Sequence, residues 1–329
     1  MKHKGIAVLA PIALATVAAL GLGSAAQAAP AAQGDTQLVT ADQNGNLLHT
    51  IRHADGSWQK MGTIPGYGQI DYVTSAIVGG EENVVVEYQH GQDDIRVDRL
   101  VRHTDGTWDY HASLPLIPVY PEPIVATTVN GRLNLVSLTP DGPVTAELGA
   151  NGTWSAFTSV PLPVNLHLRA IAAVANGNSL RVVGLSGDSN VVSVIDRTAT
   201  GWSPVNSTVI NVGNGNIATQ LGAAQVGDTL QVAVVVDSAT NPQAVPSIAH
   251  ATMNKSGNWS TFSGVWTYGR PNQVAMTPAN GEMQLAYITE TGALYHTIRH
   301  ADGTWQEPGS VQDAAGGGLV TGPVTIAGV

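Results

Sequence analysis

The stretch HTIRHADGSWQ at residues 49–59 recurs as HTIRHADGTWQ at residues 296–306, and the two copies differ only at Ser57 and Thr304. A shorter form, RHTDGTW, occupies residues 102–108. In each copy an Asp-Gly pair supplies the positive φ angles of a tight turn, and a tryptophan follows. One turn–tryptophan element at three distant places indicates a chain built from repeats.

Tryptophan extends this repeat along most of the chain. Six tryptophans lie 46 to 57 residues apart, each with a glycine one or two positions before it: Trp58, Trp108, Trp154, Trp202, Trp259 and Trp305. A period of this length is typical of stacked or circular repeats. In the fourth unit, turn residues separate four short strands that we predict at residues 169–175, 179–185, 191–197 and 202–208.

The second strands of the units are almost continuously apolar, as at residues 133–138, 230–236 and 283–288. A short apolar run bounded by turns is typical of a strand that is covered on both faces. A propeller blade lies in this environment, between two neighbouring blades. No helical periodicity of useful length occurs after the N-terminal segment.

The two ends of the repeat region are complementary. The first unit, from residue 37, lacks a first strand, and residues 319–329 have the pattern of a first strand without a unit. We therefore predict an all-β fold, a six-bladed β-propeller of four-stranded antiparallel blades, closed by a C-terminal strand that completes the first blade. An open β-solenoid or a pair of sandwiches is the alternative.

The N-terminal segment has the features of a secretory signal peptide. Lys2 and Lys4 precede an apolar stretch at residues 6–22, and the small residues Ala26 and Ala28 flank Gln27. A transmembrane anchor is the alternative, but the stretch is short and broken at Pro11. We expect a signal peptide at 1–28, a short linker at 29–36 and a propeller domain at 37–329, hence a secreted, extracellular protein. The Ala-rich signal and the lack of cysteine suggest a bacterial exporter.

Composition excludes several functions. The net charge of −10 argues against nucleic acid, because phosphate binding needs basic patches. No later apolar stretch is long enough to span a bilayer, so no membrane insertion is expected. The chain has no cysteine, and therefore no disulfide, thiol nucleophile or Cys-ligated zinc. We predict no metal and no cofactor, and interpret residues 42–46, DQNGN, as a hairpin turn and not a calcium loop.

The pattern G-x-L-x-H-x-x-R-x-x-D-G-x-W, at residues 45–58 and 292–305, resembles the repeat of secreted bacterial and fungal β-propeller lectins, the tachylectin-like and fucose-lectin-like proteins. The resemblance covers residues 37–329. It implies ligand sites between adjacent blades, with a guanidinium or carboxylate on one blade and an aromatic ring on the next. The chain departs from these lectins because no glutamate stands beside the tryptophans at a shared repeat position.

By this resemblance, arginines of the repeat donate hydrogen bonds to sugar hydroxyls and its tryptophans stack on sugar rings. Neutral histidines of the same element can donate or accept. The predicted ligand-binding residues are His49, Arg52, Trp58, Arg102, Trp108, His296, Arg299 and Trp305. The expected partners are glycans or cell-surface saccharides.

The same residues also have a purely structural interpretation. Asp55 can cap its own turn, Arg52 can pair with a nearby carboxylate, and a tryptophan in every unit can pack between blades. Trp266 lies outside the regular spacing of the six tryptophans. It is either a loop aromatic at the mouth of a site or a residue that only fills space in the packing. On this interpretation the protein is a non-catalytic scaffold that binds protein or cell-wall partners.

Enzyme signals are weak. The turns resemble the Asp-box of sialidases, but their spacing is shorter, and the chain contains neither G-x-S-x-G nor H-E-x-x-H. We therefore predict a binding protein and not an enzyme. A propeller glycoside hydrolase stays open, since two of the 24 acidic residues at the central mouth would suffice for one.

Overall fold

The computed structural model describes residues 31–91, 94–111, 114, 123–161, 167–211, 215–238, 240–241 and 243–329. The expected signal peptide lies outside the described residues, as does the start of the expected linker. The first strand begins at Thr36, one residue before the expected start of the propeller domain. No helix of the described part is long and apolar enough to cross a membrane.

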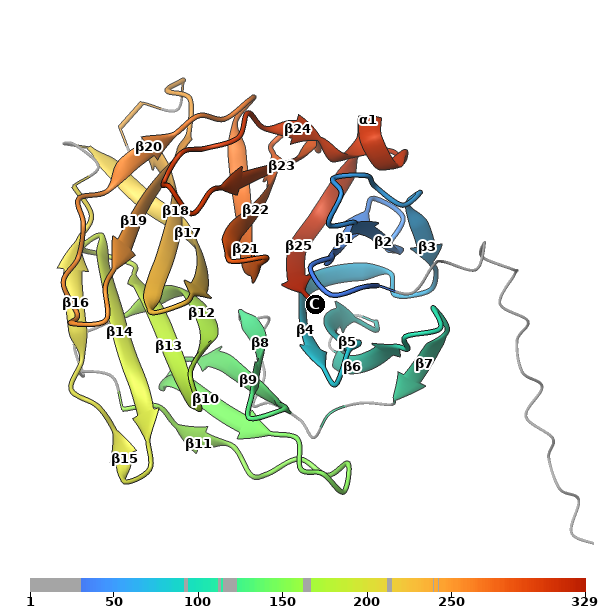
Figure 1. Cartoon of the computed structure of the whole chain (residues 1–329), viewed down its shortest axis with the longest axis horizontal. Helices are drawn as coiled ribbons and strands as arrows, with labels where there is room; N and C mark the ends of the chain where they lie inside the picture. Colours follow the sequence, from blue (N-terminus) through green and yellow to red (C-terminus); the bar gives the residue numbers. More distant parts are fainter. Residues whose placement is uncertain are drawn as a thin grey trace, which may run out of the picture.

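Six antiparallel sheets form a ring of blades around a central axis (Figure 1). Blade 1 consists of β25 (Val320–Gly328), β1 (Thr36–Asp42), β2 (Leu47–Arg52) and β3 (Gly62–Ile64). Blade 2 consists of β4 (Gln69–Val78), β5 (Glu81–Gln89), β6 (Ile95–Arg102) and β7 (Trp108–His111). Blade 3 consists of β8 (Ile124–Val129), β9 (Arg132–Thr139), β10 (Gly142–Glu147) and β11 (Thr158–Ser159).

The second half of the ring repeats this order. Blade 4 consists of β12 (Leu168–Asn176), β13 (Ser179–Ser186), β14 (Val191–Thr198), β15 (Gly201–Trp202) and β16 (Asn206–Val209). Blade 5 consists of β17 (Asn216–Val226), β18 (Thr229–Ser238), β19 (Ser247–Met253) and β20 (Ser263–Val265). Blade 6 consists of β21 (Pro271–Ala279), β22 (Glu282–Thr289), β23 (Leu294–Arg299) and β24 (Gly309–Ser310). The predicted six-bladed propeller is confirmed.

The C-terminal strand closes the ring, as the sequence predicts. β25 pairs antiparallel with β1, for example Leu38 with Ile326 and Thr40 with Val324. The Gly34 N–H also donates to the Val329 carbonyl at 2.9 Å. Figure 1 shows the red β25 beside the blue β1. The first blade therefore joins strands from both ends of the chain.

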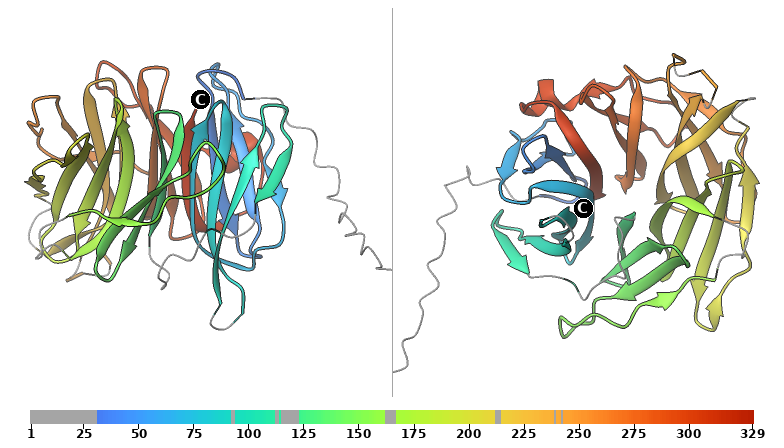
Figure 2. Two further views of the ribbon diagram at one scale, coloured as in Figure 1. Left: turned by 90° about the horizontal axis from the view of Figure 1, so that it is seen from below. Right: turned by 180° about the vertical axis from the view of Figure 1, so that it is seen from behind.

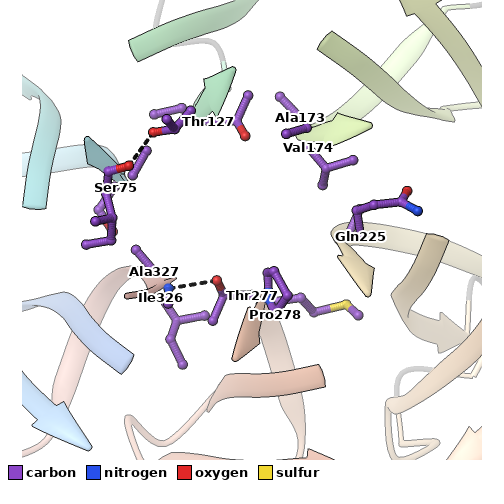
Figure 3. A pocket seen from close by; sticks show the side chains of 17 residues that line it. Ser75, Thr127, Ala173, Val174, Gln225, Thr277, Pro278, Ile326 and Ala327 are labelled. Atoms are coloured by element: carbon purple, nitrogen blue, oxygen red, sulfur yellow. Dashed lines mark hydrogen bonds between the residues drawn. The ribbon is translucent and has the colours of Figure 1, made fainter. Parts of the chain in front are cut away.

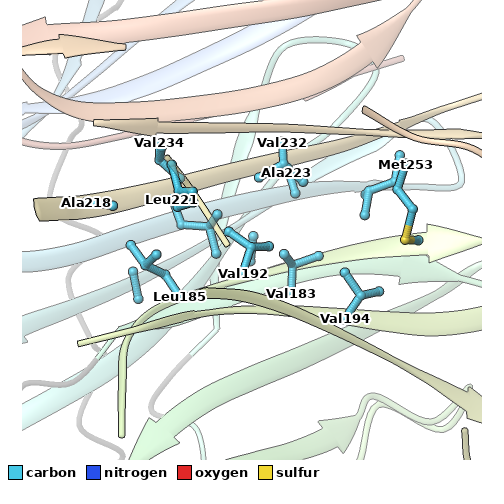
Figure 4. Packing of buried hydrophobic residues seen from close by; sticks show 14 of the residues in the cluster. Val183, Leu185, Val192, Val194, Ala218, Leu221, Ala223, Val232, Val234 and Met253 are labelled. Atoms are coloured by element: carbon cyan, nitrogen blue, oxygen red, sulfur yellow. The ribbon is translucent and has the colours of Figure 1, made fainter. Parts of the chain in front are cut away.

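The hydrophobic core lies between blades. Figure 4 shows the cluster between blades 4 and 5, where Val183 and Leu185 of β13 face Leu221 of β17 and Val232 of β18. The second strands are apolar on both faces because each of them contacts a neighbouring blade on either side. In the edge view of Figure 2, the strands of successive blades stand upright next to one another.

The innermost strands surround a cavity of about 260 Å³ on the ring axis (Figure 3). Its described lining is uncharged and consists mostly of alanine, threonine and other small side chains, with Gln225 and Thr277 among the polar ones. No carboxylate belongs to this lining. The pair of acidic residues that a hydrolase at the central mouth needs is thus absent from this part of the structure.

Two local features differ from the sequence expectations. The expected fourth strand of blade 4, residues 202–208, is split into β15 and β16, because Pro204 has no N–H for the strand ladder. A five-residue helix, α1 (Val311–Ala315), precedes β25, where no helix is expected; the Ser310 hydroxyl caps it by accepting from the Asp313 N–H at 3.1 Å. A helix of five residues is too short to show a helical periodicity of apolar residues in the sequence.

Candidate functional site

The acidic residue of the repeated element builds the turn. Asp55 Oδ1 accepts hydrogen bonds from the Ser57 N–H at 2.9 Å and the Ser57 hydroxyl at 2.7 Å, and these bonds lower the pKa of the Asp55 carboxyl. Asp105 and Asp302 repeat both bonds to the residue two positions later. The turn places each tryptophan directly across from the arginine of its own blade; the facing pairs are Arg52 with Trp58, Arg102 with Trp108 and Arg299 with Trp305.

Each tryptophan packs toward the preceding blade and stays partly exposed. Trp58 lies against a cluster that includes Ile288 and Leu294 of blade 6. Trp108 lies against Leu47 of blade 1 and its neighbours, and Trp305 against residues of blade 5. The structural interpretation therefore holds for one part of each indole, while another part reaches the surface.

Histidines of the third strands meet these tryptophans edge-on, but across the blade boundary. The ring centroids of His296 and Trp58 are 5.4 Å apart at an interplanar angle of 80°, and those of His49 and Trp108 are 5.3 Å apart at 84°. The histidine of one sequence element therefore contacts the tryptophan of the next blade and not the tryptophan of its own element. Each histidine joins the arginine and tryptophan of the following blade.

A third histidine, His250, occupies the same position against Trp305, with centroids 5.3 Å apart at 85°. It was absent from the predicted site because blade 5 has Met253 where the repeat has arginine. The signal was nevertheless present, since His250 precedes Gly257 by seven residues, as His49 precedes Gly56.

We call each set of one histidine with the arginine and tryptophan of the following blade an interface triad. Nearby arginine charge contributes to the pKa of the histidine in two of them, Arg299 for His250 and Arg52 for His296. In the third, Glu82 lies opposite Arg102 in the strand ladder and 3.2 Å from His49 Nε2. The triads are His250–Arg299–Trp305 between blades 5 and 6, His296–Arg52–Trp58 between blades 6 and 1, and His49–Arg102–Trp108 between blades 1 and 2.

Two of the triad imidazoles, those of His250 and His296, are buried and neutral. His250 is 4% exposed and His296 is 3% exposed. Burial, and to a smaller extent the nearby arginine, lowers the pKa of each imidazole to about 3. A neutral imidazole has one donor and one acceptor nitrogen, so each ring can hydrogen-bond with a hydroxyl in either sense.

The polar partners of the histidines differ between interfaces. His250 Nε2 lies 2.8 Å from Gln231 Oε1, and His49 Nε2 lies 3.1 Å from Gln37 Oε1. Gln284 occupies the corresponding position in blade 6. There, neither Gln284 Oε1 nor His296 Nε2 has a hydrogen-bond partner among the described residues, although both side chains are buried. The 6/1 interface thus has two buried polar atoms without a hydrogen-bond partner in the part of the chain that the structure describes.

The three arginines are not equivalent. Arg52 and Arg299 are half-buried and reach the surface beside their tryptophans. Arg102 is only 2% exposed and lies near Glu82, which is fully buried. Two triads therefore present a guanidinium at the surface, and the third holds it inside against a carboxylate.

A second histidine of the element, directly after the arginine, contacts a carboxylate within its own blade. His53 Nδ1 contacts Asp35 at 2.9 Å, and the same position is occupied by His103 with Glu81 at 2.6 Å and His300 with Glu282 at 2.8 Å. Each pair ties the end of the third strand to the start of the second. The Arg-His dipeptide thus combines an arginine near the interface with a structural histidine.

Two other expectations concern metals. The Asp42 turn forms a hairpin: Asp42 Oδ1 accepts from the N–H groups of Asn44 at 2.8 Å and Asn46 at 3.0 Å. Among the described residues, no group of three or more His, Asp or Glu side chains is arranged to hold a metal ion.

No protein-family model matches the chain, and no curated protein matches it in sequence. Solved structures do match. AofleA from Arthrobotrys oligospora is 13% identical over 92% of this chain and 90% of that one, with a TM-score of 0.56. A fucose-specific lectin from Aleuria aurantia is 16% identical over 88% and 96%, with a TM-score of 0.59. The BP39L lectin from Burkholderia pseudomallei is 14% identical over 87% and 98%, with a TM-score of 0.56.

The chain shares the fold of these three proteins, two of which are lectins. The resemblance that the repeat pattern predicts is thus confirmed at the level of architecture. Identities of 13% to 16% do not carry a ligand over from one chain to another, and fucose specificity belongs to the Aleuria aurantia protein.

Proposed function

We propose that the protein is a secreted carbohydrate-binding propeller, with ligand sites between adjacent blades. The observation that carries this proposal is the repetition of one triad at three consecutive interfaces. A triad combines an arginine, a buried imidazole and a partly exposed indole. Guanidinium and imidazole groups hydrogen-bond with sugar hydroxyls, and an indole covers the C–H face of the ring.

The 6/1 interface is the strongest candidate. Arg52 is half-buried beside Trp58, and the unsatisfied atoms of His296 and Gln284 lie in the same interface. A buried polar atom without a partner is unfavourable, and a ligand hydroxyl that reaches it removes that penalty. The 5/6 interface, with Arg299 and Trp305, is the second candidate.

Several weak sites on one ring would favour binding to surfaces that display many copies of a glycan. A surface glycan that engages two neighbouring interfaces binds more tightly than one site alone, because the second contact is intramolecular. The basic and apolar N-terminal segment supports export of the protein to the medium, where such glycans occur.

A non-catalytic scaffold is the second candidate function. The observation that favours it is the 1/2 interface, where Arg102 is buried near Glu82 and offers little surface to a ligand. If all three arginines act in this way, the triads only join the blades.

A glycan array tests the proposal. The protein without residues 1–28 is compared with the double variant Arg52→Ala/Arg299→Ala, and with Arg132→Ala as a matched control. Arg132 is an exposed arginine of blade 3 that pairs with Glu147, outside the triads. We expect binding by the wild type and the control and a loss of about tenfold or more in the double variant, the cost of a hydrogen bond from a charged donor. No binding by wild-type protein that is folded by circular dichroism would contradict the proposal.

A further inference from the structure

Trp266, the tryptophan outside the repeat, lies in the connection between β20 and β21 and is 60% exposed. Its neighbour Tyr268 is 37% exposed. The sequences of the other connections between blades contain no tryptophan. The corresponding residues between blades 1 and 2 are Pro65 and Tyr67, and Tyr67 is only 8% exposed. The exposed aromatic pair is therefore specific to the link between blades 5 and 6.

The pair is the outer end of a ladder of four aromatic rings. The centroids of Trp266 and Tyr268 are 5.5 Å apart with the rings tilted at 53°, and those of Tyr268 and Tyr295 are 5.7 Å apart at 37°. Tyr295 stacks on the fully buried Tyr287 at 5.2 Å and 19°. The ladder thus leads from the 5/6 core to the surface, and its two outer rings form an open corner.

Hydrogen bonds hold the connection in place. The Tyr268 N–H donates to Tyr287 Oη at 2.8 Å. Arg270 donates from Nη1 to the Ala244 carbonyl at 2.7 Å and from Nε to Glu290 at 2.6 Å. The aromatic corner is therefore ordered before any ligand arrives, and binding to it costs little conformational freedom.

The corner has one polar group on its rim. The Tyr268 hydroxyl donates to the exposed carboxylate of Glu307, which follows Trp305 in blade 6. The carboxylate has further acceptor capacity and can receive hydrogen bonds from ligand hydroxyls. It also repels anions, as does the net charge of −10.

We propose that Trp266, Tyr268 and Glu307 form an additional binding site for a neutral pyranose. The sugar stacks its C–H face on the Trp266 indole, and its hydroxyls donate to Glu307. Anionic sugars are excluded by the carboxylate. The site shares with the proposed function only the ligand class, on which it rests, and it uses none of the triad residues.

Indole NMR of protein labelled with ¹⁵N-tryptophan tests this site, because each of the seven tryptophans gives its own signal. The Trp266 signal is assigned by its loss in Trp266→Phe. The probes are methyl glycosides of fucose, galactose and glucose, and the anionic methyl glycoside of N-acetylneuraminic acid. We expect the Trp266 signal to shift with at least one neutral glycoside and not with the anionic one. In Glu307→Gln, the glycoside concentration that gives half of the maximal shift of the Trp266 signal rises about fivefold or more.

The Arg52→Ala/Arg299→Ala variant separates this site from the triads, since the Trp266 titration must persist in it. A Trp266 signal that stays constant while those of Trp58 or Trp305 shift would overturn this site and leave the triads. Constant signals throughout would overturn both proposals. A Trp266 signal that shifts with protein concentration alone would identify a contact between copies of the chain and refute the sugar site.

Discussion

His296 of blade 6 lies edge-on against Trp58 of blade 1, 5.4 Å away, although the two residues are 238 positions apart in the chain. His49, which occupies in the element of Trp58 the position that His296 occupies in the blade 6 element, instead meets Trp108 of blade 2. The near-identical elements of blades 1 and 6 thus supply opposite halves of one interface. The ring itself closes within blade 1, where β25 pairs with β1.

Replacing Trp58 tests the structural half of its role. Trp58→Ala removes an indole that packs against the cluster between blades 6 and 1. We expect a loss of about 2–4 kcal/mol in the free energy of unfolding, below the full cost of a buried tryptophan because Trp58 is partly exposed. Urea denaturation measures it. Trp266→Ala, at a 60% exposed tryptophan, is the control and should cost less than about 1 kcal/mol. Equal losses would show that Trp58 does not stabilise the interface.

The buried histidines predict how stability depends on pH. The pKa of His250 and of His296 is lowered to about 3 in the folded protein, against 6.5 for the unperturbed group. Between these two values the unfolded chain binds more protons than the folded one. Stability therefore falls as the pH falls from about 6.5 toward 3, by on the order of 1 kcal/mol per pH unit for each histidine, and is unaffected by these groups above 6.5.

Urea denaturation of His250→Gln across this pH range checks the assignment. The substitution removes one titrating group and should make the pH dependence shallower by that amount. The exposed-side His300→Gln, whose imidazole contacts Glu282 near the surface, is the comparison. An unchanged slope in His250→Gln would mean that this imidazole is protonated or accessible in the folded state.

Much of the architecture could be predicted from local signals. Asp-Gly turns, apolar second strands and the unit without a first strand all follow from short stretches, because turn chemistry and strand burial are encoded within a few residues. The expected strand at residues 169–175 differs from β12 by one residue at each end. The sequence did not predict the helix at Val311–Ala315 or the strand break at Pro204, because each affects only a few residues.

The site was less predictable, because it forms between units. The eight predicted residues all belong to the three triads. His49 and Trp58, which share one sequence element and one blade, contact opposite neighbouring blades, and local sequence does not show this. His250 was missed since its own blade lacks the arginine, which the next blade supplies as Arg299. Whether these residues bind a ligand stays a prediction.

The Arg102–Glu82 pair predicts an interaction that only a double substitution reveals. Glu82 is fully buried and Arg102 is 2% exposed, so Arg102→Leu leaves a buried carboxylate without its positive charge. We expect a loss of about 3 kcal/mol. In Glu82→Leu/Arg102→Leu most of that loss should return, with a coupling energy of about 2 kcal/mol in the double-mutant cycle. Strictly additive losses in urea denaturation would show that the two charges do not interact.

Ring closure should depend on one face of β25. Ile326 is 4% exposed and contacts the core between blades 6 and 1, so Ile326→Ala leaves a cavity and should cost about 2–4 kcal/mol. Thr321 is an exposed residue of the same strand, and Thr321→Ala should change stability by less than about 0.5 kcal/mol. Because β25 pairs with β1, Ile326→Ala should also accelerate hydrogen exchange of the β1 amides. Unchanged exchange in β1, together with the expected loss of stability, would show that blade 1 holds together without β25.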